Sequence, residues 1–328
     1  MIFFPAAMKA LVLNRPGGGL ALQDVDLPDR PDECRVQVRM AGICGTDLEL
    51  IRGYADFAGV PGHEFTGVVV EAPPHARSWM GRRVVGEINV GCGDCRFCRL
   101  GVKEHCERRS VLGIRDRSGA FAEYVSLPPD NLREIPEDLE DERAVFVEPT
   151  AAACRILEQT EVGPSTRAAV VGDGRMGLLT AQVLRAAGAA VTVVGRHPEK
   201  LAVAAALDLP ALPDADADPL ARAFDLVIDV SGRAAGLSLA LRLTRPRGVV
   251  VLKSTFHGEL AWTPWPAIVD EITLVGSRCG PFAPAISRIR SAEVNVRPLI
   301  SRVVPLDDWP AAFEAAAREL KVLFHVGG

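Results

Sequence analysis

The chain has 328 residues, which is long for a single hydrophobic core and sufficient for two domains. Its 48% hydrophobic and 24% charged residues are typical of a soluble globular protein. A net charge of -5 gives no electrostatic reason to expect a nucleic acid or an anionic membrane as a partner. No apolar run approaches the roughly 18 residues that a membrane-spanning helix needs.

The chain begins with an apolar stretch, MIFFPAA, that is too short and too uncharged for a signal peptide. We therefore expect residues 1–7 to be an extension without a structural role, and MKALVLNRPG, from Met8, to form the first strand. Without an export signal, the predicted compartment is cytoplasmic and reducing. Clustered cysteines in such a compartment are more often metal ligands than disulfides.

Two short motifs in the first fifth of the chain carry side chains that bind metals. AGICGTDLEL supplies Cys44, and PGHEFTG supplies His63 and Glu64. Each is a weak signal alone, because a lone cysteine usually packs in a core and a lone His-Glu pair usually belongs to a solvated turn. Together a thiolate, an imidazole and a carboxylate are suited to zinc with one coordination position open.

Half of the eight cysteines fall in one short segment, 91–106. They are separated by two, two and seven residues, and they are Cys92, Cys95, Cys98 and Cys106. The glycines between them permit tight turns, so four thiolates can converge on a closed tetrahedral zinc site, which is structural because no position is left for a substrate. An iron–sulfur cluster, disulfides and a zinc-ribbon nucleic-acid module are the alternatives. The last would need a basic surround, which the acidic residues of this segment offset.

The stretch VFVEPTAAACRIL places Glu148 at the end of a predicted apolar strand, where it is a further candidate ligand. After it, residues 167–197 predict a strand, a glycine turn, a helix and a second strand. Gly172, Gly174 and Gly177 form the pattern G-x-G-x-x-G of that turn. Glycines between a strand and a helix let a pyrophosphate meet the helix N-terminus, so we expect a dinucleotide to bind there.

The residues beside these glycines are candidate cofactor contacts. Arg175 and Met176 open the predicted helix, and the second strand ends in Gly195, Arg196 and His197. An NAD enzyme usually offers a carboxylate about 20 residues beyond the glycines, for the ribose hydroxyls. Here the glycine leaves room beside the 2′ position and the arginine can pair with a phosphate, so NADP is favoured over NAD. The alternative is a solvated arginine, with NAD accepted through backbone contacts.

The alternation of these elements defines the predicted fold class, α/β. FDLVIDVSG, GVVVLKS and ITLVGSRCG are further strands with helical segments between them, which indicates a parallel sheet covered on both faces. We expect a loop-rich, mostly antiparallel β domain over 8–147 and a Rossmann doubly wound parallel-sheet domain over 148–284. The remaining segment, 285–328, should return to the first domain.

The order of the motifs resembles the medium-chain zinc-dependent alcohol dehydrogenase family. That order is Cys-Gly-Thr-Asp, Gly-His-Glu, the four-cysteine segment, Glu-Pro and the glycine turn, and the likeness runs from about Met8 to the C-terminus. VEPTAAA is similar to the sorbitol, threonine and glucose dehydrogenase branch, whereas the ethanol-type branch has a cysteine as its third ligand near this place.

The resemblance implies a role for each residue around the first metal. Cys44, His63 and Glu64 would be ligands of a catalytic zinc, and Glu148 would be a fourth, exchangeable ligand or would bind through water. Asp47 would orient the ligand imidazole.

The resemblance also implies a proton path and a substrate pocket. Thr46 would pass the alcohol proton onward. Glu49 stands where many relatives have the histidine that ends the relay, so either this carboxylate accepts the proton or the relay ends in water. Tyr54 and Phe57, between the two ligand motifs, are candidates for the mouth of the substrate pocket.

The activity implied by the family is a zinc- and nicotinamide-dependent dehydrogenase that interconverts a secondary alcohol, polyol or sugar-like alcohol and its ketone. Zinc would act as a Lewis acid on the alcohol oxygen while hydride passes to the nicotinamide. The family also implies a GroES-like first domain, one catalytic and one structural Zn²⁺, and a homodimer or homotetramer. A zinc-free quinone or enoyl reductase and a non-catalytic nucleotide-binding regulator or structural protein remain as alternatives.

Overall fold

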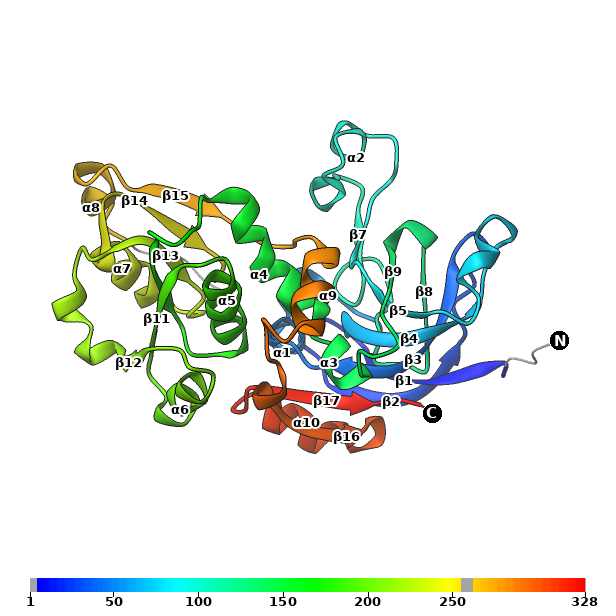
Figure 1. Cartoon of the computed structure of the whole chain (residues 1–328). Helices are drawn as coiled ribbons and strands as arrows, with labels where there is room; N and C mark the ends of the chain where they lie inside the picture. The colour runs from blue at the N-terminus through cyan, green and yellow to red at the C-terminus, as the bar shows by residue number, and fades with distance from the viewer. Residues whose placement is uncertain (1–4, 255–261, 328) are drawn as a thin grey trace. The chain divides into compact units, whose positions relative to one another are not determined.

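The chain forms two compact units, of which a computed structural model describes residues 5–254 and 262–327. Unit 1 comprises Met1–Glu148 and Ile300–Gly328, and unit 2 comprises Pro149–Leu299 (Figure 1). The second division lies later in the chain than the predicted end of the Rossmann domain at residue 284. That residue falls inside helix α9 (Phe282–Arg290), which unit 2 contains whole.

Unit 1 is built around a seven-stranded sheet in the order β16-β17-β3-β4-β5-β9, with β8 also pairing with β3. Its neighbours are antiparallel except for the parallel pair β16–β17. The strands of this sheet are β3 (Cys34–Gly42), β4 (Glu64–Glu71), β5 (Arg83–Gly86), β8 (Tyr124–Leu127), β9 (Leu132–Glu134), β16 (Ile300–Pro305) and β17 (Lys321–His325).

Two hairpin-like pairs and several short helices complete unit 1. The strand pairs are β1 (Ala7–Leu13) with β2 (Leu20–Asp26) and β6 (Asn89–Val90) with β7 (Ser110–Val111). The α-helices are α1 (Gly45–Ile51), α2 (Arg96–Arg99), α3 (Asp141–Ala144) and α10 (Trp309–Ala316). The 3₁₀ turns are η1 (Tyr54–Asp56), η2 (Pro74–Trp79), η3 (Lys103–His105), η4 (Pro129–Asn131) and η8 (Leu306–Asp308).

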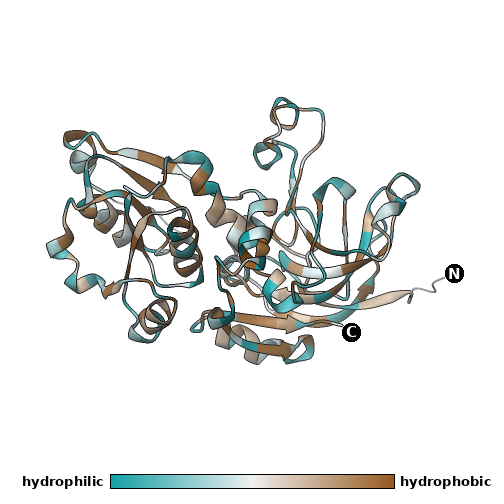
Figure 2. Ribbon diagram, viewed as in Figure 1, coloured by the Kyte–Doolittle hydropathy of each residue, from teal (hydrophilic) through white to brown (hydrophobic). Residues whose placement is uncertain are grey.

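The C-terminal strand β17 joins the main sheet of unit 1 as the strand next to its edge. It pairs with β3 on one side and with β16 on the other, and it is hydrophobic along most of its length (Figure 2). Phe324 from this strand packs edge-on against Phe121, with ring centroids 5.2 Å apart, and Phe313 of α10 joins them. These aromatic rings form a core that supports the loop at residue 62, where a candidate ligand motif lies.

Unit 2 is a six-stranded, wholly parallel sheet in the order β12-β11-β10-β13-β14-β15. This is the strand order of a Rossmann doubly wound fold, as the sequence predicted. The strands are β10 (Arg167–Val171), β11 (Ala190–Gly195), β12 (Ala211–Pro213), β13 (Phe224–Asp229), β14 (Thr244–Leu252) and β15 (Thr273–Gly276).

Helices connect the strands of unit 2 and cover its sheet. Residues 168–171 of the central strand β10 are all buried, because a parallel strand between two helical layers has no solvent-exposed face. Besides α9, the α-helices are α4 (Val147–Gln159), α5 (Arg175–Ala186), α6 (Pro198–Ala206), α7 (Ala234–Leu243) and α8 (Trp265–Val269). The 3₁₀ turns are η5 (Asp214–Asp216), η6 (Asp218–Leu220) and η7 (Arg297–Leu299).

One sequence prediction about local structure is wrong. Glu148 does not end a strand but lies in the first turn of helix α4. Proline is tolerated in the first turn of a helix, where backbone N–H groups have no partner in any case, so Pro149 does not prevent this helix. The alanine run that follows favours a helix over a strand. Among the described residues, no helix is both long enough and apolar enough to span a membrane.

Candidate metal centres and dinucleotide site

Helix α1 fixes the first ligand motif. Cys44 is the N-cap residue of this helix, and its backbone N–H donates to Asp47 Oδ2 over 2.7 Å. The other oxygen of Asp47 accepts the backbone N–H of Gly62 over 3.3 Å, and the carboxylate is completely buried. The aspartate therefore closes a capping box on α1 and ties the first ligand motif to the second.

The second ligand motif depends on a turn that only glycine allows. Gly62 has a φ of +96°, and a Cβ added to it would lie 2.6 Å from the ring of Phe121. His63 follows this turn, and Glu64 begins β4 directly opposite Gly42 of β3. Both ligand candidates are consequently held by the register of the sheet.

The structure brings three predicted ligands together. One ligand atom from each of Cys44, His63 and Glu64 lies within 4.8 Å of the others. His63 Nδ1 also lies 3.3 Å from Asp47 Oδ1. Glu64 Oε1 is buried and has no hydrogen-bond partner among the described residues, so it is available to a cation. Three protein ligands of these kinds fit a zinc ion that keeps one position for a substrate oxygen.

The electrostatics of this cluster favour a cation. Burial of the imidazole opposes its charged form, but the carboxylate of Asp47, and then the sulfur of Cys44, raise the pKa of His63 well above its ordinary value. The carboxylate and the sulfur thus place negative charge beside a buried imidazole, and a bound metal ion would neutralise that charge.

The other predicted residues of this region have different surroundings. Cys44 Sγ lies 3.8 Å from Thr46 Oγ1, so the threonine hydroxyl is beside the metal cluster. Glu49 Oε1 is paired with Arg52 Nη1 over 2.5 Å, so this carboxylate already has a cationic partner. Glu148 is half-buried in α4 and is not part of the cluster that the described residues form.

Lys321 is a residue of this centre that the sequence reasoning missed. It begins β17, is completely buried, and forms an ion pair with Glu64. The available signal was a lysine next to the apolar run VLF, because a lysine within a buried strand needs a partner.

The two candidates for the substrate pocket differ in burial. Phe57 is 5% exposed, and its ring lies where a Cβ on Gly59 would contact it at 3.4 Å, so it packs inside unit 1. Tyr54 is 38% exposed in η1. The surroundings of Phe57 are those of a packing residue, while Tyr54 is accessible to a ligand.

The four-cysteine segment forms a second cluster. All four Sγ atoms lie within 4.8 Å of one another, and Cys92 and Cys98 are 4.0 Å apart. Sulfurs around a tetrahedral zinc with bonds of about 2.3 Å would be separated by roughly 3.8 Å. The hydrogen bond from the backbone N–H of Cys98, in α2, to the sulfur of Cys95 is the main reason that the pKa of Cys95 is lowered to about 7. Burial raises the pKa of Cys98 to about 11, so the thiols of this cluster are shifted in both directions and it is the geometry that fits the predicted structural zinc.

Unit 2 places the glycine turn between β10 and α5. Gly172 has a φ of +131°, a conformation that residues with a side chain rarely adopt. Gly174 is the N-cap residue of α5, and Arg175 and Met176 begin its first turn, followed by Gly177. The backbone N–H groups at the start of this 12-residue helix fit a pyrophosphate.

The end of β11 differs from the prediction in one respect. The space beside Gly195 is not empty, because a Cβ there would lie 2.5 Å from the carboxylate of Asp173, the second residue of the glycine turn. Asp173 Oδ2 accepts the backbone N–H groups of Arg196 and His197, each over 2.6 Å, and the His197 ring lies 2.9 Å from Oδ1. Sequence reasoning missed this carboxylate because its partners lie more than 20 positions away.

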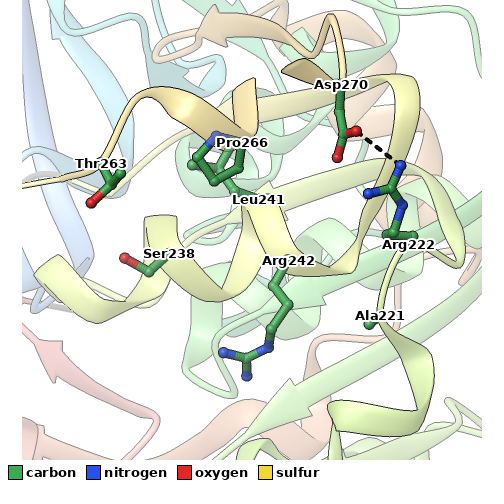
Figure 3. A pocket seen from close by; sticks show the side chains of 8 residues that line it. All are labelled: Ala221, Arg222, Ser238, Leu241, Arg242, Thr263, Pro266 and Asp270. Atoms are coloured by element: carbon green, nitrogen blue, oxygen red, sulfur yellow. Dashed lines mark hydrogen bonds and ion pairs between the residues drawn. The ribbon is translucent and has the colours of Figure 1, made fainter. Parts of the chain in front are cut away.

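Unit 2 also has a pocket that none of the predicted site residues lines. Arg222, Ser238, Arg242 and Asp270 are among its residues (Figure 3). Arg222 Nη2 lies 2.9 Å from Asp270 Oδ1, so this cation already has an anionic partner. The pocket contributes nothing to the sites described above.

A Rossmann sheet with a glycine turn and two clusters of metal-binding side chains together define a metal- and nicotinamide-dependent oxidoreductase. Two family models match this chain. The alcohol dehydrogenase GroES-like domain matches residues 30–137, and the zinc-binding dehydrogenase domain matches residues 176–291.

Individual proteins show the same likeness. The sorbitol dehydrogenase of Halalkalibacterium halodurans is 28% identical over 96% of this chain and 98% of its own. A Sinorhizobium meliloti protein described as a zinc-binding dehydrogenase, crystallised with NADP, is 30% identical with a TM-score of 0.89 over 98% of this chain and 100% of its own. An Escherichia coli CFT073 alcohol dehydrogenase complexed with NADH is 26% identical, with the same TM-score and coverage.

The chain belongs to the medium-chain zinc-dependent alcohol dehydrogenase family, as its motif order predicted. It is an NAD(P)-linked oxidoreductase that interconverts alcohols and ketones. The alternatives of a zinc-free reductase and of a non-catalytic regulator are not favoured by these relatives.

Proposed function

We propose that this enzyme oxidises a secondary alcohol of the polyol or sugar-like class, and reduces the corresponding ketone, at the cluster of Cys44, His63 and Glu64. The observation that carries the proposal is the convergence of these three ligands around a buried carboxylate oxygen that has no partner among the described residues. The polyol class is supported by the likeness to a sorbitol dehydrogenase over nearly the whole chain.

In this proposal each of the side chains around the first cluster has its own role. Bound Zn²⁺ would supply Lewis acidity to the substrate oxygen, and bound nicotinamide would exchange hydride with the carbinol carbon. Asp47 holds the imidazole of His63 in place. Thr46 takes the proton of the substrate hydroxyl and passes it toward water or Glu49. Glu148 is retained as an exchangeable ligand.

A panel of polyols and simple secondary alcohols, followed by nicotinamide absorbance, tests the activity and the substrate class. Zinc analysis of the same preparation should give two Zn²⁺ per chain, one at each cluster. If protein whose first cluster has lost its zinc turns over any of these alcohols as fast as the zinc-loaded protein does, the proposal is wrong.

We also propose that the enzyme prefers NADP to NAD. Arg196 and His197 follow β11, where the 2′ position of a bound adenosine ribose would lie, and the carboxylate of Asp173 is already engaged by both of their backbone N–H groups. The arginine side chain is then the charged group left for a 2′-phosphate. The solved relatives include one with NADP and one with NADH, so the preference must be measured.

The preference is tested by titrating both dinucleotides. We expect NADP to bind about tenfold more tightly, which corresponds to about 1.4 kcal/mol. Arg196→Ala should remove most of this difference and leave the affinity for NAD unchanged. Equal or tighter binding of NAD to the unmodified enzyme would contradict the proposal without affecting the dehydrogenase assignment.

Finally, we propose a homodimer or homotetramer assembled through unit 2. Among the described residues β15 is the last strand of its sheet, so one edge of its backbone has no paired strand there. Beside it four large apolar side chains are between 37% and 74% exposed: Trp265, Ile268, Val269 and Leu274. A second copy would cover these side chains. Light scattering measures the molar mass of the wild type, and Val269→Glu should shift this mass toward that of the monomer.

The thiolates of the zinc sites need a reducing compartment, and we retain the cytoplasm as the proposed location.

A further inference from the structure

Lys321 is buried more completely than a lysine ordinarily is. Its side chain is 0% exposed and is among the largest fully buried side chains of the described residues. Lysines are almost never fully buried unless they are paired. The ammonium group pairs with Glu64 Oε2, donates to the carbonyl oxygen of Ile43 over 3.1 Å, and lies 5.7 Å from the ring centre of Phe146.

The register of the sheet delivers both partners of this ion pair to one place. Gly42 of β3 lies opposite Glu64 of β4 on one side and opposite Leu323 of β17 on the other. A Cβ on Gly42 would lie 2.7 Å from Lys321 Cε and 2.9 Å from Glu64 Oε2. The ion pair therefore occupies the volume that a side chain at residue 42 would otherwise fill.

Stability alone is a weak reason for this arrangement. A buried ion pair contributes little net stability, because desolvation of the two charges offsets their attraction, and an apolar pair of similar volume often serves a fold as well or better. The partner here is a candidate metal ligand, and it is this contact that gives the lysine a role in the site.

The charges around the metal position show what the lysine changes. Three groups there are anionic when a metal is bound: the thiolate of Cys44 and the carboxylates of Glu64 and Asp47. A dication offsets two of these charges and leaves one in a buried site, where an uncompensated charge is costly. Lys321 supplies the remaining positive charge.

The two oxygens of Glu64 are thereby divided. Oε2 belongs to the ion pair, and Oε1 is buried without a partner among the described residues. A carboxylate held in this way can offer a metal one oxygen, and the neighbouring ammonium weakens the pull of that oxygen on the metal.

We propose that Lys321 is a positioning residue of the metal centre. This proposal rests on the metal site of the proposed function. It restrains Glu64 so that only Oε1 is offered to the metal, and its positive charge lowers the affinity of the site for the metal.

The proposal makes a prediction about metal affinity that does not depend on turnover. Lys321→Met keeps the volume of the buried side chain but removes its charge, so Glu64 becomes a full ligand. Zn²⁺ should then bind at the first cluster at least about tenfold more tightly, because an unscreened unit charge in contact with the carboxylate is worth more than that factor. Competition with a graded series of chelators measures this affinity. The zinc of the four-cysteine segment serves as the internal control in the same sample.

Two further variants separate charge from packing. Lys321→Arg keeps the charge and should keep wild-type zinc affinity within a few-fold. Lys321→Met combined with Glu64→Gln removes both charges and should bind zinc more weakly than Lys321→Met alone. Cobalt(II) placed at the first cluster should show a changed visible absorption spectrum in Lys321→Met, because its ligand set has changed, and a wild-type spectrum in Lys321→Arg.

The outcomes distinguish this proposal from the proposed function. If folded Lys321→Met binds zinc no more tightly than the wild type, with an unchanged cobalt spectrum, the positioning role is wrong while the metal site stands. If the wild type binds no metal at Cys44, His63 and Glu64, the proposed function itself fails. Should Lys321→Met not fold, Glu64→Gln with and without Lys321→Met provides the test. Equal zinc affinity of those two variants would show that the metal does not sense the lysine charge.

Discussion

The two candidate metal centres of unit 1 are built in opposite ways. The four-cysteine cluster comes from one short loop, and three of its four cysteines are only half-buried. The first cluster gathers a helix N-terminus, a turn and a strand, its histidine and glutamate are buried, and its lysine comes from the far end of the chain. A centre made of four like ligands is closed and can only hold structure. A centre made of three unlike ligands, embedded in a sheet, has a position left for chemistry.

This contrast predicts that changes at the first cluster abolish chemistry and spare the fold, whereas changes at the second do the reverse. The largest effect on turnover should come from Cys44→Ser. A serine hydroxyl is a poor zinc ligand at neutral pH, so the first cluster should lose its metal and turnover should fall by roughly 10³-fold or more, as expected when a Lewis acid is removed. Steady-state rates measure the loss.

The control for Cys44→Ser is its folding. The variant should keep one zinc per chain, held by the four-cysteine cluster, and its circular dichroism spectrum should match the wild type. A variant with near-normal turnover and only one zinc would contradict the assignment of the first cluster as catalytic.

Thr46→Val should have the next largest effect. Valine has the shape of threonine without the hydroxyl, so it removes the proton acceptor beside Cys44 and should lower turnover by about 10²–10³-fold. Zinc content and dinucleotide affinity of Thr46→Val should be unchanged. Thr46→Ser is the matched control: it keeps the hydroxyl and should restore most of the rate. A wild-type rate across the whole pH range would mean that water alone carries the proton.

The difference between the centres also explains what the sequence could reveal. The four-cysteine cluster and the glycine turn are local, so the spacing of Cys92 to Cys106 and of Gly172 to Gly177 predicted them directly. The parallel sheet of unit 2 followed from alternating strand and helix patterns, and its strand order confirms the prediction.

The parts that sequence reasoning missed depend on long-range pairing. Lys321 and Glu64 are 257 positions apart and meet only because β17 pairs with β3 beside β4. Asp173 reaches the end of β11 only because β10 and β11 are adjacent. Strand pairing of this kind is set by the whole core, and no pattern of neighbouring residues reports it. Glu148 was misplaced for another reason, since an apolar run before a proline fits a strand or a helix equally well.

Asp47→Asn should act on the first cluster through a ligand rather than as one. The amide keeps one oxygen, so it can accept the backbone N–H of Cys44 or that of Gly62 but not both, and it loses the charge that holds the imidazole of His63. Zinc affinity at the first cluster should fall by about 10–100-fold, the usual effect of removing a carboxylate behind a ligand histidine. Chelator competition measures this, and the zinc of the four-cysteine cluster should be unaffected. An unchanged affinity would assign Asp47 to helix capping alone.

Cys98→Ser should have the smallest effect on chemistry and marks the other side of the contrast. Its sulfur is one of four that converge in the loop 91–106, and the loss of one thiolate should release the zinc of that cluster. The loop then loses the ligand that orders it, so hydrogen exchange within these residues should increase and the temperature of unfolding should fall by several degrees. The first cluster shares none of these ligands, so turnover per zinc-loaded first cluster should stay within a few-fold of the wild type when assayed well below the unfolding temperature.

Cys154→Ser, at a buried cysteine outside both clusters, is the matched control and should release no zinc. A folded, stable Cys98→Ser enzyme with a large loss of turnover would show that the two centres are not independent, because a purely structural cluster cannot lower the rate of a stable enzyme.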